Sequence, residues 1–253
     1  MNDVAHSSGH SAVTSTPQAL CEWGLSGIDA LLRQVAVLVI VDVLSFSTAV
    51  DVAVSRGAIV YPLSFSDAKA AEAAAIQKGA VLATRRGGYG QFSLSPASLT
   101  KIVPGTKLML PSLNGSRLSF AASERLTRVT IMAGCLRNAS AVAAAARSAA
   151  GERPIAVIPA GETWPDRSLR PSIEDWLGAG AILERLGGPC SPEAAVARSA
   201  YRSSGEELAS LIRLSVSGRE LSEAGFAGDV DLALEEDASK AVPILSEGAF
   251  RCA

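Results

Sequence analysis

The residues with the clearest capacity for chemistry follow the apolar run 35–41. Asp42 stands directly after that run, and the hydroxyls of Ser47 and Thr48 come shortly afterwards. A carboxylate and hydroxyls at the carboxyl end of a buried strand form an arrangement by which α/β enzymes bind a metal ion and a phosphate group. We therefore expect this stretch to form one edge of an active site, with Ser47 and Thr48 as substrate ligands.

A second polar turn follows the run KLMLPS. It contains Asn114, Gly115, Ser116 and Arg117, so a glycine that permits close approach of the backbone lies beside small polar side chains and a guanidinium. Such a turn at the start of a helix suits an anion, whereas Asn-Gly by itself indicates only a turn.

Asn138 follows another β-branched run, at 129–134. It can cap the alanine-rich helix expected over 139–150. Because the polar residues of this chain concentrate at the ends of expected strands, Asn138 is also a candidate substrate ligand.

Two adjacent acids, Glu174 and Asp175, stand at the expected start of a helix, after Pro171 and Ser172. The helix dipole favours carboxylates there, which is one interpretation of the pair. The other is a hard-metal site, because Mg²⁺ binds carboxylates from separate loops while it keeps several waters. In that interpretation Asp42, Glu174 and Asp175 are the ligands of Mg²⁺.

A glycine-rich loop is expected over 84–96. It carries Arg85 and Arg86, followed by Gly87 and Gly88, and it contains no acidic residue. Paired guanidiniums on such a loop could clamp a phosphate, sulfonate or carboxylate, and solvation at the surface is the ordinary alternative. The glycines match neither a dinucleotide fingerprint nor a phosphate-binding P-loop, so neither NAD nor ATP binding is indicated.

The inventory of side chains excludes several kinds of catalyst. The chain has two histidines, His6 and His10, and both precede residue 18 in a polar segment that we expect to be a disordered or mobile tail, 1–17. The four cysteines are widely spaced without a Cys-x-x-Cys pair. A Ser-His-Asp triad, a Cys-His catalyst and a histidine-ligated zinc site are therefore not expected, which leaves carboxylates, cationic side chains, hydroxyls and hard cations.

The elements that must position these residues alternate along the chain. Short β-branched runs are followed by alanine-rich helical stretches, a pattern typical of a layered α/β/α fold with a mixed, largely parallel sheet. Strands are expected near 35–41, 58–62, 81–83, 107–110, 129–133, 155–158 and 242–245, and helices near 47–55, 66–78 and 191–214. No linker divides the chain, so we expect one domain over 18–253, with room for two tightly packed lobes.

Composition and charge limit the partners. The chain has 253 residues and a net charge of −2, so it offers no basic field for nucleic acid or for an acidic membrane surface. Its apolar runs are too short to span a bilayer and its start does not resemble a secretion signal, so we expect a cytoplasmic protein. The expected partner is a small anionic phosphate or sulfonate compound, and a homodimer is left open.

The chain resembles the 2-phosphosulfolactate phosphatase family, often called ComB, in segments that occur in the same order. They are VDVLSFST, RRGGYGQFSLSP, PSLNGSR, CLRNASAVA, AGETWPDRSLRPSIEDWLGAG and the late segment SVSGRELSEAGFAGDVDLALEEDASKAVPIL. The resemblance covers about residues 35–246. It implies a ComB-like α/β fold and Mg²⁺-dependent hydrolysis of 2-phospho-3-sulfolactate to 3-sulfolactate and phosphate, a step toward coenzyme M in organisms that make it.

Three positions depart from the family pattern. Ser45 stands where family members commonly have Arg, Arg85 stands where they have Glu, and Leu94 stands where they have Asn before Ser-Pro. These changes leave open an altered substrate, such as another phosphorylated hydroxy acid, or a degenerate member of the family that binds anions without catalysis.

The resulting hypothesis is metal-assisted hydrolysis of a phosphate monoester, with a catalytic set of Asp42, Arg86, Asn114 and Glu174. Arg86, with Arg85 or Arg117, would bind the phosphate or sulfonate, and the turn at 114–116 would donate hydrogen bonds. A second possibility makes Asp42 a covalent nucleophile.

Overall fold

The computed structural model describes residues 18–64, 67–125 and 128–253, and the expected tail at 1–17 lies outside them. The strands are β1 Ala19–Cys21, β2 Val37–Val41, β3 Ile59–Ser64, β4 Val81–Leu82, β5 Lys107–Ser112, β6 Thr130–Gly134, β7 Ile155–Pro159, β8 Glu162–Thr163, β9 Leu169–Arg170, β10 Pro243–Ser246 and β11 Ala249–Cys252. The helices are α1 Gly24–Leu31, α2 Phe46–Ser55, α3 Ala68–Lys78, α4 Gly115–Arg125, α5 Ala139–Ala150, α6 Ile173–Leu186, α7 Pro192–Ser204, α8 Leu208–Leu214, α9 Val216–Glu223 and α10 Ala227–Ala233. Single 3-10 turns are η1 Pro96–Leu99, η2 Leu136–Asn138 and η3 Gly205–Glu207.

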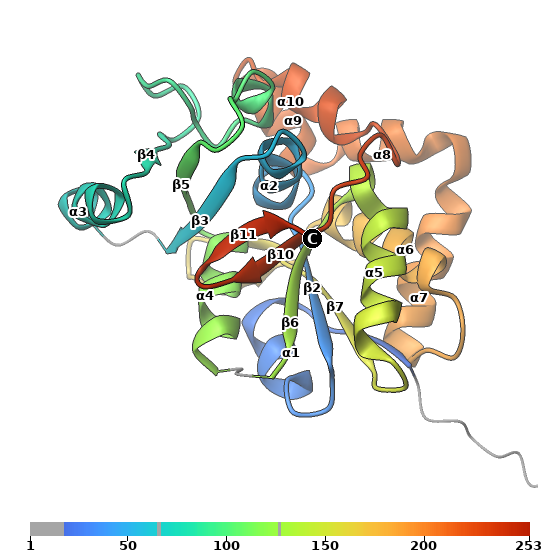
Figure 1. The fold of residues 1–253 in the computed structure, drawn as a ribbon. Helices are drawn as coiled ribbons and strands as arrows, with labels where there is room; N and C mark the ends of the chain where they lie inside the picture. Colours follow the sequence, from blue (N-terminus) through green and yellow to red (C-terminus); the bar gives the residue numbers. More distant parts are fainter. Residues whose placement is uncertain (1–17, 65–66, 126–127) are drawn as a thin grey trace, which may run out of the picture.

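The main sheet consists of two parallel blocks joined by a hairpin. Among the described residues, nine strands pair in the order β1-β7-β2-β6-β10-β11-β3-β5-β4. Neighbouring strands are parallel within β1-β7-β2-β6 and within β3-β5-β4. The C-terminal hairpin of β10 and β11 pairs antiparallel with β6 on one side and with β3 on the other (Figure 1). The sheet is therefore mixed and mostly parallel with flanking helices, which confirms the predicted fold class.

Strand β2 is the rigid base of the site because both of its faces are buried. The side chains of Val37, Val39 and Val41 join one hydrophobic core with α5 and α6, whereas those of Leu38 and Ile40 join another core with α2. Successive residues of a strand point to opposite faces, so burial on both sides requires an uninterrupted apolar run. The polar residues that follow β2 are thereby held at a fixed point of the sheet edge.

The expected strands are present with shifted ends, and the helical predictions need two corrections. The helix expected over 191–214 is broken, because Gly205 has a φ of +44° and α7 gives way to η3 before α8 begins. In the helix expected over 66–78, Asp67 is the N-cap and accepts the N–H of Lys69 at 3.3 Å, while residue 66 lies outside the described residues. Helix α1 was not predicted; it packs against β7 and α4.

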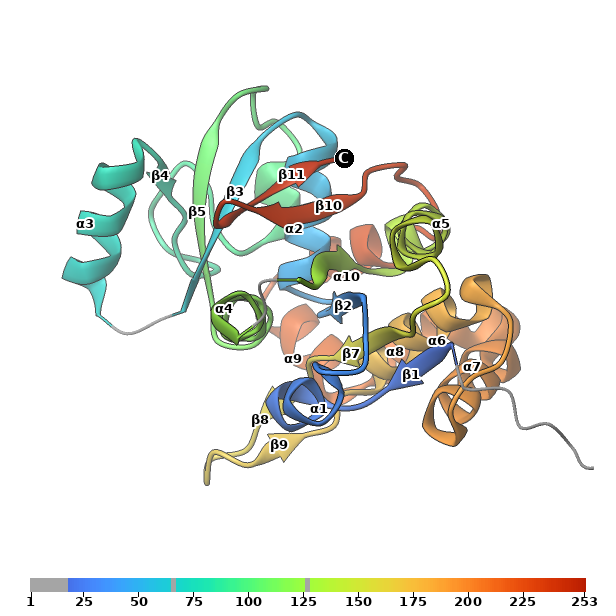
Figure 2. The ribbon, with the colours of Figure 1, turned by 60° about the horizontal axis from the view of Figure 1, so that its bottom comes forward.

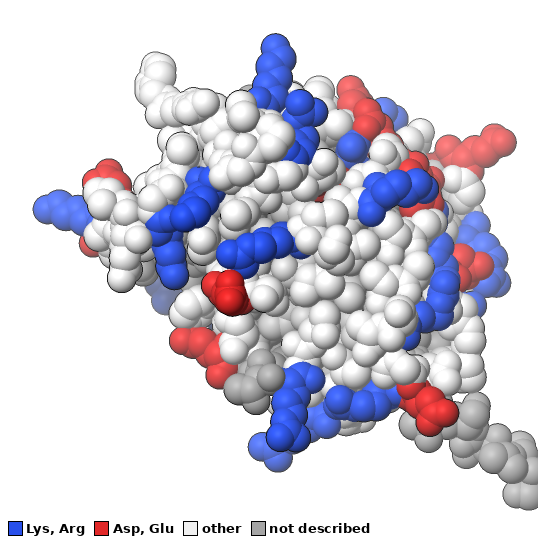
Figure 3. Space-filling model, viewed as in Figure 1, with Lys and Arg blue, Asp and Glu red and all other residues white. Residues whose placement is uncertain are grey.

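The periphery of the molecule carries a small separate hairpin and a mixture of charges. Figure 2 shows the small hairpin of β8 and β9 beside α1 and apart from the main sheet. On the face seen in Figure 3, basic and acidic side chains are interspersed around an uncharged centre, so that face carries no continuous basic patch. Within the described residues, no helix is both long enough and apolar enough to cross a membrane.

Candidate active site

The chain turns from β2 into α2 at Asp42, and two buried hydroxyls hold this turn. The N–H of Asp42 donates to Ser47 Oγ at 3.1 Å, and that hydroxyl donates to the carbonyl of Ile40 at 2.9 Å. The hydroxyl of Thr48 donates to the carbonyl of Val43 at 2.5 Å. Both hydroxyl side chains are fully buried, so the structure places them in bonds that shape the turn. Their contact with a substrate stays a prediction.

Asp175, in the first turn of α6, connects two strand ends. Its Oδ1 accepts the N–H of Val43 at 2.7 Å, and its Oδ2 accepts the N–H of Gly161 at 2.9 Å. The side chain therefore ties α6 to the turns after β2 and β7. It also lies close enough to Asp42 for the two carboxylates to repel each other. The structure thus brings together two of the three residues predicted to bind a metal ion.

The Asn114–Gly115 turn completes the ring around Asp42. The N–H of Gly115 donates to Asp42 Oδ2 at 3.1 Å, and the amide of Asn114 donates to Glu162 Oε2 at 2.8 Å. A β-carbon on Gly115 would lie 2.3 Å from Cδ1 of Phe46, so this close approach requires glycine. The Asn-Gly pair therefore forms a turn that contacts Asp42 and Glu162. Its binding of an anion stays a prediction.

Burial and mutual repulsion dominate the electrostatics of Asp42, Glu162 and Asp175, which we call the carboxylate cluster. Burial, and next the charge of Glu162, raise the pKa of Asp42 to about 7, although nearby N–H groups and Arg86 oppose the shift. Burial, and next the carboxylates of Asp42 and Glu174, raise the pKa of Asp175 well above its ordinary value. Burial also raises the pKa of Glu162. These acids are held together at a cost that a proton or a cation would relieve.

The carboxylate cluster suits a hard cation without forming a closed cage. No group of three or more acidic, cysteine or histidine side chains in the described part of the chain has the arrangement of a ready-made metal site. Mg²⁺ binds through one or two carboxylates and keeps several waters, so buried acids with excess negative charge fit it. Glu174 is buried beside Asp175. It lines a cavity of about 270 Å³ with Arg170 and Ser217, and no member of the carboxylate cluster lines that cavity.

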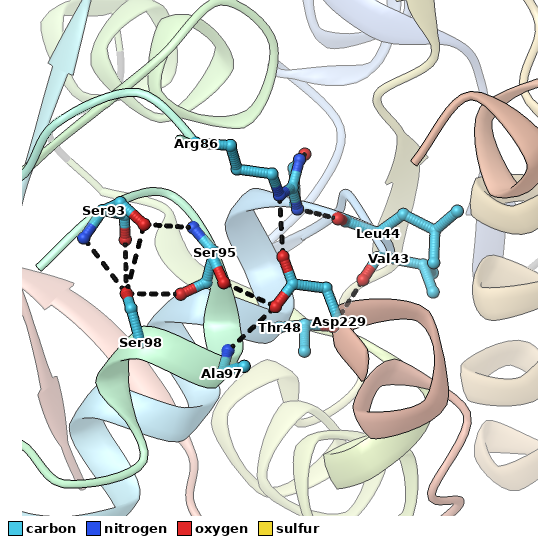
Figure 4. A network of polar contacts seen from close by, with 10 residues as sticks. Val43, Leu44, Thr48, Arg86, Ser93, Ser95, Ala97, Ser98 and Asp229 are labelled. Carbon is cyan, nitrogen blue, oxygen red and sulfur yellow. Dashed lines mark hydrogen bonds and ion pairs between the residues drawn. The ribbon is translucent and has the colours of Figure 1, made fainter. Parts of the chain in front are cut away.

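Arg86 contacts the turn after β2, and its guanidinium donates hydrogen bonds to acceptors of the protein. Its Nε donates to Asp229 Oδ2 at 2.8 Å, and one terminal nitrogen donates to the carbonyl of Leu44 (Figure 4). The other terminal nitrogen donates to Ser45 Oγ at 3.1 Å. All three nitrogens therefore bond within the protein. In this arrangement Arg86 fastens the glycine-rich loop to the turn, and its contact with a substrate stays a prediction.

Asp229 is a residue of this site that the sequence analysis missed. It lies in α10 and is 2% exposed, and its Oδ1 accepts the hydroxyl of Ser95 at 2.6 Å and the N–H of Ala97 at 3.0 Å. We call Arg86, Asp229, Ser45 and Ser95 the arginine network. Asp229 is the first of several acidic residues over 229–237, and no local pattern in the sequence points to its partner 143 positions away.

Comparison with known proteins identifies the family. The family model described as 2-phosphosulpholactate phosphatase matches residues 28–248. The chain belongs to this family. It is 32% identical over 216 residues to the 2-phosphosulfolactate phosphatase of Methanothermobacter thermautotrophicus, which covers 83% of this chain and 87% of that protein. It is also 28% identical over 214 residues to a probable 2-phosphosulfolactate phosphatase of Gloeobacter violaceus, which covers 81% of this chain and 86% of that protein.

The three positions expected to depart from the family pattern are Ser45, Arg85 and Leu94, and each belongs to the arginine network or is next to one of its members in the chain. Ser45 belongs to the network as an acceptor for Arg86. Leu94 donates its N–H to the carbonyl of Thr84 at 3.0 Å, and its side chain packs against the core that contains α2. Arg85 is exposed at the start of the loop. All three substitutions are thus accommodated in the fold.

Two other residues predicted to bind the substrate of this phosphatase-family chain, Ser116 and Asn138, form hydrogen bonds with the backbone. Ser116 is fully buried and its hydroxyl donates to the carbonyl of Leu110 at 2.8 Å. Asn138 is also fully buried; its Oδ1 accepts the N–H of Cys135 at 2.9 Å, and it makes no side-chain cap to α5. Gly87 has a φ of +73°, which favours glycine in the loop after Arg86.

Two of the residues predicted to bind the substrate, Gly88 and Arg117, are exposed to solvent. Gly88 follows in the same loop and is exposed. Arg117 is exposed on α4, and it lines a cavity that also contains Asn114 and Glu162. Glu162 is a site residue that the sequence analysis missed, although it stands three residues after the end of β7, near the strand end as Asp42 is. That shared position at a strand end was the signal available in the sequence.

Proposed function

We propose that this protein is a Mg²⁺-dependent phosphatase for a small phosphate monoester, and that its substrate is 2-phospho-3-sulfolactate, which yields 3-sulfolactate and phosphate. Membership of the family supports the phosphatase class. The observation that carries the mechanism is the carboxylate cluster beside the Asn114–Gly115 turn. There the buried Asp42, after β2, and the buried Asp175, at the start of α6, lie near the half-buried Glu162, at the start of β8.

The three residues of the carboxylate cluster have different roles in this proposal. Asp42 and Glu162 would hold Mg²⁺, while Asp175 fixes the two strand ends through its bonds to backbone N–H groups. When bound, Mg²⁺ withdraws negative charge from phosphoryl oxygens and makes a water molecule more acidic. Asn114 orients Glu162. Water adds to phosphorus, the phosphorus–oxygen ester bond breaks, and the leaving hydroxy acid takes up a proton.

The first test uses purified protein and p-nitrophenyl phosphate. We expect phosphate release with Mg²⁺, loss of release with a chelator, and recovery when Mg²⁺ is restored. No release under any of these conditions, together with retained binding of phosphate, would indicate the degenerate, anion-binding member of the family. Phosphate release that continues unchanged in chelator-treated protein would contradict the metal proposal.

A second test addresses the substrate. Values of kcat/KM for 2-phospho-3-sulfolactate, 2-phospholactate and 2-phosphoglycerate should be highest for the first compound. A clear preference for one of the other esters would retain the phosphatase class and replace the substrate. Trapping with hydroxylamine distinguishes a covalent aspartyl phosphate at Asp42 from direct attack by water, since only the former gives a hydroxamate.

A further inference from the structure

A cavity of about 240 Å³ opens beside the carboxylate cluster, between α1, the start of α4 and the β8–β9 hairpin. Its walls include Asn114 and Glu162, which hydrogen-bond to each other at 2.8 Å and form the boundary between the cavity and the cluster. A ligand in this cavity therefore lies next to the proposed reaction centre. Its volume is just below the range of roughly 300–1,000 Å³ that drug-sized ligands occupy, so it suits a small compound rather than a nucleotide or a peptide.

Two guanidiniums line this cavity from separate elements. Arg117 comes from the first turn of α4 and Arg167 from the tip of the β8–β9 hairpin, and both are exposed at its mouth. The first residues of α1, Gly24, Leu25 and Ser26, form another wall. The backbone N–H groups at the start of a helix favour an anion. The carboxylate of Glu162 is the acidic member of the lining and opposes these groups.

The hairpin holds Arg167 in place at some conformational cost. Arg167 has a φ of +70°, where a residue other than glycine is uncommon. Its N–H donates to the carbonyl of Trp164 at 2.8 Å, and Asp166 holds the next residue by accepting the N–H of Ser168 at 2.9 Å. A glycine at this position would relieve the strain but would bring no charge to the cavity.

We propose that this cavity receives a second acidic group of the substrate, the one that is not hydrolysed, and that Arg117 and Arg167 bind it. The inference rests on the proposed phosphatase function and specifies its substrate class: a phosphate monoester whose short carbon chain carries a further sulfonate or carboxylate. Arg86 does not line this cavity, and three of its five N–H donors bond to Asp229, Ser45 and the carbonyl of Leu44. Forked hydrogen bonds from a guanidinium match a sulfonate or carboxylate well.

The experiment compares three esters that differ in their second acidic group. They are 2-phospho-3-sulfolactate, with a sulfonate and a carboxylate; 2-phospholactate, with a carboxylate; and p-nitrophenyl phosphate, with neither. The variants are R117Q, R167Q and the double variant. The control is the double variant R33Q/R251Q, which removes the same charge from residues that do not line the cavity.

For the double variant, we expect kcat/KM for 2-phospho-3-sulfolactate to fall about 100-fold, mainly through KM, and each single variant to lose about tenfold. The fall for p-nitrophenyl phosphate should be at least tenfold smaller. If 2-phospholactate falls as steeply as the sulfonated ester, the cavity binds the carboxylate; if it does not, the cavity binds the sulfonate. An equal fall for all three esters overturns the inference, as does the same selective loss in the control.

A binding measurement separates this inference from the proposed function. Calorimetric titration with 3-sulfolactate should show binding to the unaltered protein, at least tenfold weaker binding to R117Q/R167Q and unchanged binding to the control. Unchanged binding to R117Q/R167Q, or no binding to the unaltered protein, overturns the inference. Failure of Mg²⁺-dependent turnover on every ester, by contrast, counts against the proposed function itself.

Discussion

The carboxylate cluster and the arginine network flank the same turn, and they treat charge in opposite ways. In the network, the buried carboxylate of Asp229 is paired with Arg86 at 2.8 Å and also accepts the hydroxyl of Ser95 and the N–H of Ala97. In the cluster, by contrast, the main electrostatic neighbours of Asp42 and Asp175 are other acids, which raise their pKa values together with burial.

This difference separates scaffold from reaction centre. A buried charge that is paired and hydrogen-bonded is compatible with stability, whereas buried charges of like sign destabilise the fold unless something neutralises them. The arginine network therefore needs no ligand, and we infer that it fixes the loop and the turn. The carboxylate cluster gains stability only from a proton or a bound cation, as expected of a site built for binding. Substitutions on the two sides should accordingly have opposite effects on stability.

The largest effect should come from Asp42→Asn. Loss of this carboxylate should lower Mg²⁺-dependent kcat about 100- to 1000-fold, because a proposed metal ligand next to the reacting phosphate is removed. In chelator at pH 8, the same variant should be more stable than the unaltered protein, since the repulsion with Glu162 and Asp175 is reduced. Steady-state kinetics and urea unfolding measure the two effects.

The matched control for this variant is Asp231→Asn, which removes an exposed carboxylate that pairs with Arg213. It should leave kcat unchanged and should not raise stability. An Asp42→Asn protein that hydrolyses the ester at the normal rate would remove this residue from the reaction centre.

The opposite sign is expected for Asp229→Ala. This change leaves the guanidinium of Arg86, which is 14% exposed, without its carboxylate, and it frees the N–H of Ala97 and the hydroxyl of Ser95. Breaking a buried ion pair typically costs a few kcal/mol, and we expect a loss of about 2–4 kcal/mol in the free energy of unfolding. Urea unfolding of Asp229→Ala beside Asp231→Ala tests it. A gain in stability, as expected for Asp42→Asn, would abolish the distinction between the two regions.

The pH dependence of stability should sharpen the comparison further. The folded pKa of Asp42 is raised to about 7, above the value in an unfolded chain, so the folded state binds the proton more tightly over this range. In chelator, the contribution of Asp42 to stability should therefore be greatest at the acidic end and should fall as pH rises from about 4 to about 7, by on the order of 3 kcal/mol. Asp42→Asn should flatten this part of the profile, and Mg²⁺ should offset the fall. Stability that rises over this range equally in both proteins would show that the cluster is not repulsive.

The sequence predicted those parts of the site that depend on local pattern. The apolar run before Asp42 specified a buried strand, and a strand has a carboxyl end at which polar residues gather. The partners of Asn114 and Arg86 were not predictable in this way. Asn114 bonds to Glu162, 48 positions away, and Arg86 pairs with Asp229, 143 positions away. Such pairs depend on how the two parallel blocks of the main sheet are joined. The C-terminal hairpin joins them, and of its two strands only β10 was predicted.

The smallest effect should come from Ser45→Ala, which removes one acceptor from the arginine network and nothing from the carboxylate cluster. Arg86 keeps Asp229 and the carbonyl of Leu44, so the loss should be about 0.5–1.5 kcal/mol, the usual value of one hydrogen bond. The kcat should change less than about threefold, because the carboxylates do not move. If Ser45→Ala instead lowers kcat as much as Asp42→Asn while stability changes little, then Ser45 acts on the substrate directly. The network would then be part of the reaction centre rather than its support.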